Sequence, residues 1–158
     1  MTQIRPTPLT ATDFAPFGDV LEASGDFRVI NGGWCHRHHD QAQLAFGTDG
    51  KAGISIFQAK PRQFPYDFDL IERHPEGSQA FLPMSSDPFL VIVSHGPDHR
   101  PLAFLTNGAQ GINFHRGTWH GVLTPLNGSG LFAVVDRIGP TPNLEEFRYP
   151  KPWTVIAP

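Results

Sequence analysis

The segment FDLIERHPEGSQAFLPM, residues 68 to 84, predicts two β-strands joined by a tight turn. Its halves, FDLIERH and QAFLPM, have the length and apolar content of strands, and the Pro and Gly of PEGS favour a turn between them. Alternate side chains of a strand project to the same face, so Glu72 and His74 share one face and Arg73 projects to the other. One face of the first strand therefore carries a carboxylate and an imidazole.

Similar apolar segments recur along the chain, separated by turn-forming residues. The 16 Pro and 16 Gly residues are scattered and not clustered, as expected for many turns between short elements. Short helical turns are predicted only where Thr10 precedes Asp13 and where Asn143 precedes Glu146. The pattern predicts an all-β sandwich or barrel with short peripheral helices, whose further strands cover residues 53–59, 89–94, 102–105, 112–114, 119–123 and 131–136.

Length and composition limit the classes of function. The 158 residues suit one domain, residues 1–158. With 12 Lys and Arg against 15 Asp and Glu, the net charge is -3, and no basic block suggests a nucleic-acid surface. No apolar run reaches the roughly 18 residues of a membrane span, the N-terminus lacks the apolar core of a signal peptide, and Cys35 has no partner for an internal disulfide. We expect a cytoplasmic protein that binds neither nucleic acid nor membrane.

A second histidine-rich segment, INFHRGTWHGVL at residues 112–123, completes a pattern that resembles the two cupin motifs. In the common form of those motifs, three histidines and a glutamate bind a divalent metal. Here Glu72, His74, Gln79 and His120 stand at the ligand positions, and His115 stands where a proline is usual. The resemblance implies a cupin-like, jelly-roll type antiparallel β-barrel in which a tight turn at Gly117 leads into a strand with His120 facing inward.

Longer phrases are similar to those of the ureidoglycolate lyase family, also called ureidoglycolate hydrolases. These phrases are INGGWCHRHHD (30–40), ERHPEGSQAFLPM (72–84), AFLTNGAQGINFHRGTWH (103–120) and VVDR (134–137). The resemblance covers nearly the whole chain. It implies a homodimer that cleaves (S)-ureidoglycolate to glyoxylate and urea in allantoin breakdown.

Such a substrate needs a base, an acid and a cationic group. It is a carbinolamine with a carboxylate, so a base must remove the hydroxyl proton while an acid protonates the departing nitrogen. Glu72, His74 and His120 are the candidates for these two roles. Among the candidate substrate-binding residues, Gln79 would bind the urea end, and Arg73 and Arg116 would bind the carboxylate, with His115 beside them. Three further candidates lie in a glycine-rich loop that either covers the mouth of the barrel or reaches the other subunit: Asn31, Arg37 and His38.

The metal is a separate question. Glu72, His74, Gln79 and His120 form a reasonable ligand set for a divalent ion, and the resemblance implies nickel. A neutral Gln amide is a weaker ligand than Glu, so a metal-independent acid and base site stays equally open.

Near the end of the 131–136 strand, Asp136 and Arg137 are able to pair with each other.

Other functions are compatible with the residues alone. The chain is also readable as another small-molecule cupin enzyme, such as a metal-dependent isomerase or dioxygenase, or as a noncatalytic cupin-type ligand-binding module. Lyase and hydrolase activities require the same catalytic groups. Their products separate them, because the lyase releases urea and the hydrolase releases ammonia and carbon dioxide.

Overall fold

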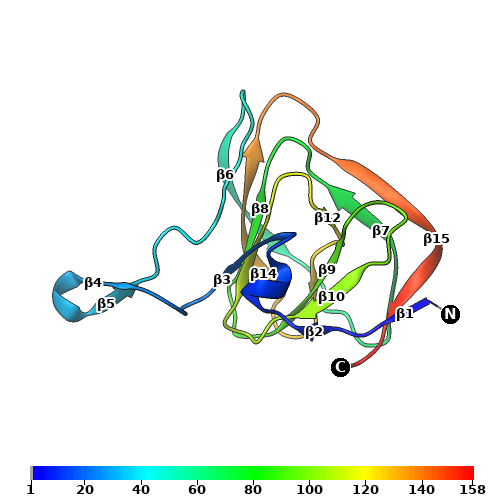
Figure 1. Ribbon diagram of the computed structural model, residues 1–158, viewed down its shortest axis with the longest axis horizontal. Coiled ribbons are helices and arrows are strands. Elements are labelled where there is room, and N and C mark those ends of the chain that lie inside the picture. Colours follow the sequence, from blue (N-terminus) through cyan, green and yellow to red (C-terminus); the bar gives the residue numbers. More distant parts are fainter. Residues whose placement is uncertain (1) are drawn as a thin grey trace.

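Two curled β-sheets enclose the interior of the protein in the computed structural model, which describes residues 2–158 (Figure 1). Along the larger sheet the order is β1 (Thr2–Ile4), β15 (Glu145–Val155), β7 (Tyr66–Arg73), β12 (Trp119–His120), β9 (Phe89–Ser94), β10 (Leu102–Leu105) and β2 (Thr7–Pro8), and β13 (Thr124–Pro125) also pairs with β9. The second sheet runs β3 (Gly18–Leu21), β11 (Gly111–Phe114), β8 (Gln79–Pro83), β14 (Leu131–Ile138) and β6 (Lys51–Gln58). The predicted all-β, cupin-like fold is confirmed.

Strand pairing is antiparallel except where β1 meets β15 and β2 meets β10. The predicted bounds of β9 and β10 are confirmed, and most other predicted strands differ by one or two residues at an end. The predicted strand 119–123 is too long, because the chain leaves the ladder after His120 and pairs with β9 again only at Thr124. No helix among residues 2–158 is long and apolar enough to cross a membrane.

One of the two predicted helical turns is confirmed. Helix α1 (Ala11–Phe14) is capped by Thr10, whose side chain accepts a hydrogen bond from the backbone N–H of Asp13 at 3.1 Å. The turn predicted at Asn143 is wrong, because Glu145 begins β15 and pairs opposite Arg73 of β7. Sheet pairing outweighs the local capping signal there.

Strand β9 is buried on both faces, which explains its uninterrupted apolar sequence FLVIVS. Val91 and Val93 project into the interior, where they belong to a core that includes Phe14 and Phe114. Leu90 and Ile92 project outward into a second core that includes Ile71, Tyr149 and Val155 from β7 and β15. The site-bearing strands β7 and β12 are therefore held between two packed layers.

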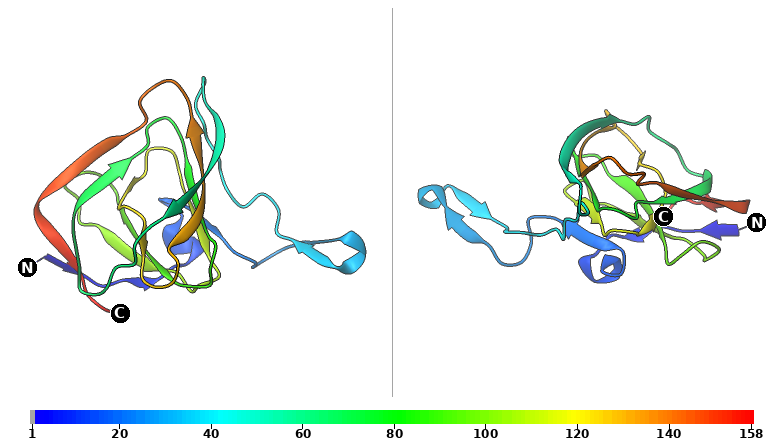
Figure 2. Two further views of the ribbon diagram at one scale, coloured as in Figure 1. Left: turned by 180° about the vertical axis from the view of Figure 1, so that it is seen from behind. Right: turned by 90° about the horizontal axis from the view of Figure 1, so that it is seen from above.

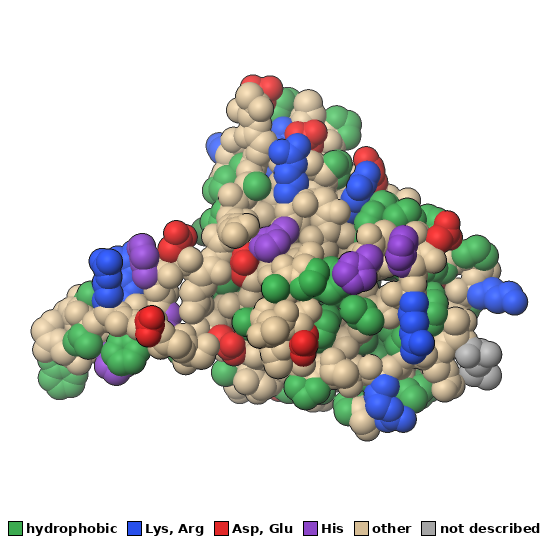
Figure 3. Space-filling view, in the orientation of Figure 1, with side chains coloured by type: hydrophobic (Ala, Val, Ile, Leu, Met, Phe, Trp, Pro, Cys, Tyr) green, Lys and Arg blue, Asp and Glu red, His purple; other side chains and the backbone are tan. Residues whose placement is uncertain are grey.

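An arm, residues 24–40, protrudes from the body and carries the two-stranded sheet of β4 (Arg28–Ile30) and β5 (Cys35–Arg37) (Figures 1 and 2). The segment predicted as a glycine-rich loop forms the tip of this hairpin, with a 3-10 turn η1 at Asn31–Gly33. Trp34 at the tip is 92% exposed. The space-filling view shows the arm standing apart from the body, with apolar, basic and histidine side chains on it (Figure 3).

Candidate functional site

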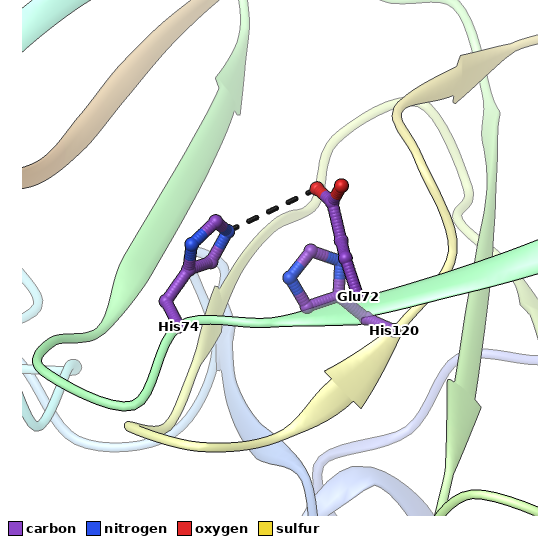
Figure 4. A group of neighbouring side chains, drawn as sticks. All are labelled: Glu72, His74 and His120. Carbon is purple, nitrogen blue, oxygen red and sulfur yellow. Dashed lines mark ion pairs between the residues drawn. The ribbon is translucent and has the colours of Figure 1, made fainter. Parts of the chain in front are cut away.

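Glu72, His74 and His120 lie together in the barrel interior (Figure 4). Glu72 projects inward near the end of β7, and His74 follows that strand directly. β12 pairs with β7 in the register that sets His120 opposite Glu72. The three side chains present ligand atoms that all lie within 4.8 Å of one another, and His74 Nε2 lies 3.9 Å from Glu72 Oε1.

The turn before β12 links the two motifs. Gly117 has φ +78, in the left-handed region that glycine adopts without strain, so the predicted tight turn is confirmed. Its backbone N–H donates a hydrogen bond to the carbonyl oxygen of His74 at 3.0 Å. The end of the first motif is thus tied directly to the start of the second.

His120 is a buried, neutral imidazole. Its side chain is stacked on the ring of Phe114, with centroids 4.1 Å apart and planes inclined by 7°. Burial lowers the pKa of His120 to about 3, so the ring carries one proton near neutral pH. That proton lies on Nδ1, which donates to the carbonyl oxygen of Gly121 at 2.9 Å. Nε2 is buried and has no partner among the described residues, so its lone pair is available to a substrate or a metal ion.

His74 is held by two oxygen atoms. Its Nδ1 lies 2.7 Å from the carbonyl oxygen of Asn143, and its Nε2 lies 3.1 Å from Gln79 Oε1. Gln79 Nε2 in turn donates to Asp136 Oδ2 at 3.1 Å. A carboxylate only accepts, so Asp136 fixes the orientation of the Gln79 amide and directs its oxygen at His74.

Asp136 is a residue of this site that the sequence did not reveal. The pairing considered between Asp136 and Arg137 is absent, because the Arg137 guanidinium instead donates to Thr141 Oγ1 at 2.8 Å. Adjacent residues of a strand project to opposite faces, and β14 places Asp136 directly opposite Gln79 of β8. Strand parity, applied to the 131–136 segment, would have excluded the pair with Arg137.

Glu72 sits where its carboxyl group is a stronger base than a solvated one. Burial raises the pKa of Glu72, the neighbouring His74 opposes this, and Glu146 on β15 raises it further. A carboxylate with a raised pKa takes a proton more readily, which suits a general base.

Of the three residues of the cluster, Glu72 lines a cleft of about 410 Å³, and the two histidines lie behind its wall. Glu72 and Gln79 supply polar groups to its wall, and Lys60 and Arg62 supply positive charge. The remaining lining is largely apolar and comes from Phe57, Ala59, Phe81, Val122 and Leu123. A cleft of this size, apolar with a few polar groups, is typical of small-molecule sites.

The other candidates from the sequence lie elsewhere. Arg73 projects away from the cleft, as strand parity predicts, and its Nε lies 2.6 Å from Glu145 Oε2 while its guanidinium covers Trp119. Arg116 is exposed and donates to the carbonyl oxygen of Pro75. His115 Nε2 lies 3.0 Å from Asp19 Oδ1, in a separate cleft that Arg116 also lines.

Asn31, Arg37 and His38 belong to the arm and are not brought to the cluster by their own chain (Figure 1). His38 Nδ1 instead lies 3.1 Å from the carbonyl oxygen of Ser24, within the arm. The fold of the single chain therefore does not place these three residues at the cluster.

The residues present fit a divalent metal ion. One carboxylate and two imidazoles converge, and the unpartnered Nε2 of the neutral His120 is the form in which imidazole binds metals. A further oxygen, Gln79 Oε1, lies within hydrogen-bond distance of His74 Nε2. Such a donor set suits nickel, zinc, iron or manganese.

The comparisons with known proteins point to one family over nearly the whole chain. A family model described as ureidoglycolate lyase matches residues 1–156. A ureidoglycolate lyase of Rhodobacter capsulatus is 52% identical, over 98% of this chain and 99% of that protein. Proteins of the same name from Mesorhizobium japonicum and Agrobacterium fabrum are 46% and 45% identical, over 100% and 96% of this chain and 100% and 94% of those proteins.

We predict that the metal-free protein binds one nickel ion per chain in a calorimetric titration. His120→Phe keeps a ring against Phe114 but removes Nε2, so it should weaken nickel binding at least about 100-fold. His99→Phe, at an exposed histidine, is the matched control and should bind nickel as the wild type does. Nickel binding that is unchanged in His120→Phe, or absent in the wild type, would contradict a metal role for the cluster.

Proposed function

Because this chain belongs to the ureidoglycolate lyase family, we propose that it cleaves (S)-ureidoglycolate to glyoxylate and urea in the breakdown of allantoin. The observation that carries the proposal is the convergence of Glu72, His74 and His120 beside a cleft of about 410 Å³. The family match speaks against another kind of cupin enzyme and against a noncatalytic binding module.

The geometry supports separate roles for the three residues. The pKa of about 3 makes His120 an acceptor near neutral pH, so it does not deliver a second proton. Glu72, whose pKa burial raises, takes the proton of the substrate hydroxyl as the carbon–nitrogen bond breaks. His74 then protonates the departing urea nitrogen, and His120 Nε2 accepts a hydrogen bond from the substrate. The electrons of the broken bond stay on that nitrogen, and the hydroxyl carbon becomes the aldehyde of glyoxylate.

Gln79 and Asp136 act on this cluster by orientation. Asp136 holds the Gln79 amide, and Gln79 Oε1 holds His74 at 3.1 Å, so the imidazole faces Glu72 in a fixed direction. As an alternative to these proton-transfer roles, Glu72, His74 and His120 would hold a divalent ion, with nickel the expected metal. When bound, such an ion supplies positive charge that stabilises the developing negative charge on the substrate oxygen.

We predict that the purified protein releases glyoxylate and urea in equal amounts from racemic ureidoglycolate and consumes one enantiomer. Glu72→Gln should lower kcat by about 100-fold or more, because it removes the base. Glu145→Gln, on β15 and paired with Arg73 away from the cleft, is the matched control and should keep near-native turnover. Ammonia and carbon dioxide in place of urea would instead indicate a hydrolase, and an active Glu72→Gln variant would remove Glu72 from the mechanism.

We also propose that the protein is a homodimer in which each arm packs on the second copy. An isolated two-stranded hairpin is at best marginally stable in water, and this arm leaves Trp34 92% exposed and Val29 58% exposed. Exposed apolar side chains of this size mark interaction surfaces. Closed association of two copies places each arm on an identical partner.

The receiving surface is the outer face of β6, β14 and β8, hereafter the outer face. Ala133 of the central strand β14 pairs with Ile56 of β6 on one side and with Leu82 of β8 on the other, so the three share this face. Val135 of β14 pairs with Ile54 of β6 in the same way. Ile54 is 75% exposed and Ile56 is 58% exposed. β6 is also an edge strand, with backbone groups open to pairing.

We predict a dimer mass by light scattering at micromolar protein. Ile54→Asp adds a charge to the outer face and should shift the mass toward the monomer, as should Trp34→Ala in the arm. Leu102→Asp, at a partly exposed leucine of the larger sheet, is the control and should leave the mass unchanged. A monomeric wild type would refute the arm exchange.

The cytoplasmic location and the single-domain organisation stay predictions from the sequence.

A further inference from the structure

The proposed substrate carries a carboxylate that the arginines singled out in the sequence are not placed to bind. Arg73 pairs with Glu145 on the far side of β7, and Arg116 is bonded to the Pro75 carbonyl outside the cleft. An anion that enters beside the carboxyl group of Glu72 needs a positive group in the same cleft, because like charges repel strongly where water is partly excluded.

Lys60 and Arg62 are the cationic side chains that line this cleft together with Glu72 and Gln79. Neither forms an ion pair with a carboxylate anywhere in residues 2–158. Both are exposed, so their charges are open to a ligand that enters from solvent. Their charges are therefore not neutralised within the chain.

The segment that carries them is anchored on both sides. The backbone N–H of Ala59 donates to the carbonyl oxygen of Gly130 at 2.9 Å, and that of Arg62 donates to the carbonyl oxygen of Pro125 at 2.8 Å. The Arg62 guanidinium lies over the ring of Tyr66, 5.8 Å from its centroid. The two hydrogen bonds fix the backbone from which the side chains reach the cleft, and the ring contact restrains the Arg62 side chain, so less entropy is lost when a ligand binds.

We propose that Lys60 and Arg62 form the carboxylate-binding end of the cleft and so determine its specificity for small 2-hydroxy carboxylates that carry an amide-type nitrogen. The inference rests on the proposed function. With the carboxylate on Lys60 and Arg62, the hydroxyl-bearing carbon faces Glu72 and the ureido group faces the Gln79 amide. Phe57 and Phe81 line the same cleft and supply apolar surface beside these polar groups.

The steady-state test uses Lys60→Gln, Arg62→Gln and the double variant. Loss of a charge-assisted contact should raise the KM for ureidoglycolate by about 10- to 100-fold in the double variant, with kcat changed much less, because the contact is made in both the ground state and the transition state. Arg62→Lys should recover part of the loss. Arg148→Gln, at an exposed arginine paired with Asp69, is the control for removing a surface charge and should change neither constant.

A binding test separates this proposal from the proposed function. Oxamate and oxamide have the same shape and differ in charge, so NMR titration of the wild type should show binding of oxamate in preference to oxamide. The preference should disappear in the Lys60→Gln, Arg62→Gln double variant and persist in Arg148→Gln, whether or not the protein turns over ureidoglycolate. Loss of turnover in the wild type with this pattern intact would sink only the proposed function.

Three results would overturn the proposal. The first is a wild type that does not prefer oxamate to oxamide. The second is a preference that survives in a folded Lys60→Gln, Arg62→Gln double variant. The third is a preference that an Arg73→Gln, Arg116→Gln double variant loses while the Lys60→Gln, Arg62→Gln double variant keeps it. Circular dichroism and thermal melting of each variant establish that it is folded.

Discussion

The pairing of β12 between β7 and β9 is the constraint on which the site depends. β12 has two residues, Trp119 and His120, and its register sets His120 opposite Glu72 and beside Val93. The hydrogen bond from the Gly117 N–H to the His74 carbonyl holds the preceding turn against the first motif. A shift of one residue would turn His120 to the other face and put Trp119 in the interior.

Burial of this pairing determines the chemistry of its members. Two packed cores enclose β7 and β9, so His120 is withdrawn from water and stays neutral, with Nε2 unpartnered among the described residues. The same desolvation raises the pKa of Glu72, which lies nearer the cleft. One environment thus makes one residue a fixed acceptor and another a base, and the Asp136–Gln79 hydrogen bond orients the third residue, His74.

Local patterns in the sequence predicted the interior of the barrel well. Short apolar segments between turn-forming residues predicted the central strands, and parity placed Glu72 and His74 on the inner face and Arg73 on the outer one. Strand β15 was not predicted, because its sequence contains Pro150 and Pro152, and proline is usually excluded from strands. In the structure, a register shift between Arg148 and Trp153 accommodates the two prolines. Lys60 and Arg62 were not predicted as site residues, because they lie in a loop without a motif. Only the closure of the barrel brings that loop to the cleft.

The central claim is that substrate binds in this cleft with its carbinol group at Glu72, and a crystal structure of the Glu72→Gln variant with ureidoglycolate tests it most directly. We expect one enantiomer in the cleft, with its hydroxyl group within hydrogen-bond distance of the substituted side chain, its ureido nitrogen toward His74 and its carboxylate at Lys60 and Arg62. A ligand bound instead in the cleft of His115 and Arg116, away from Glu72, would contradict it.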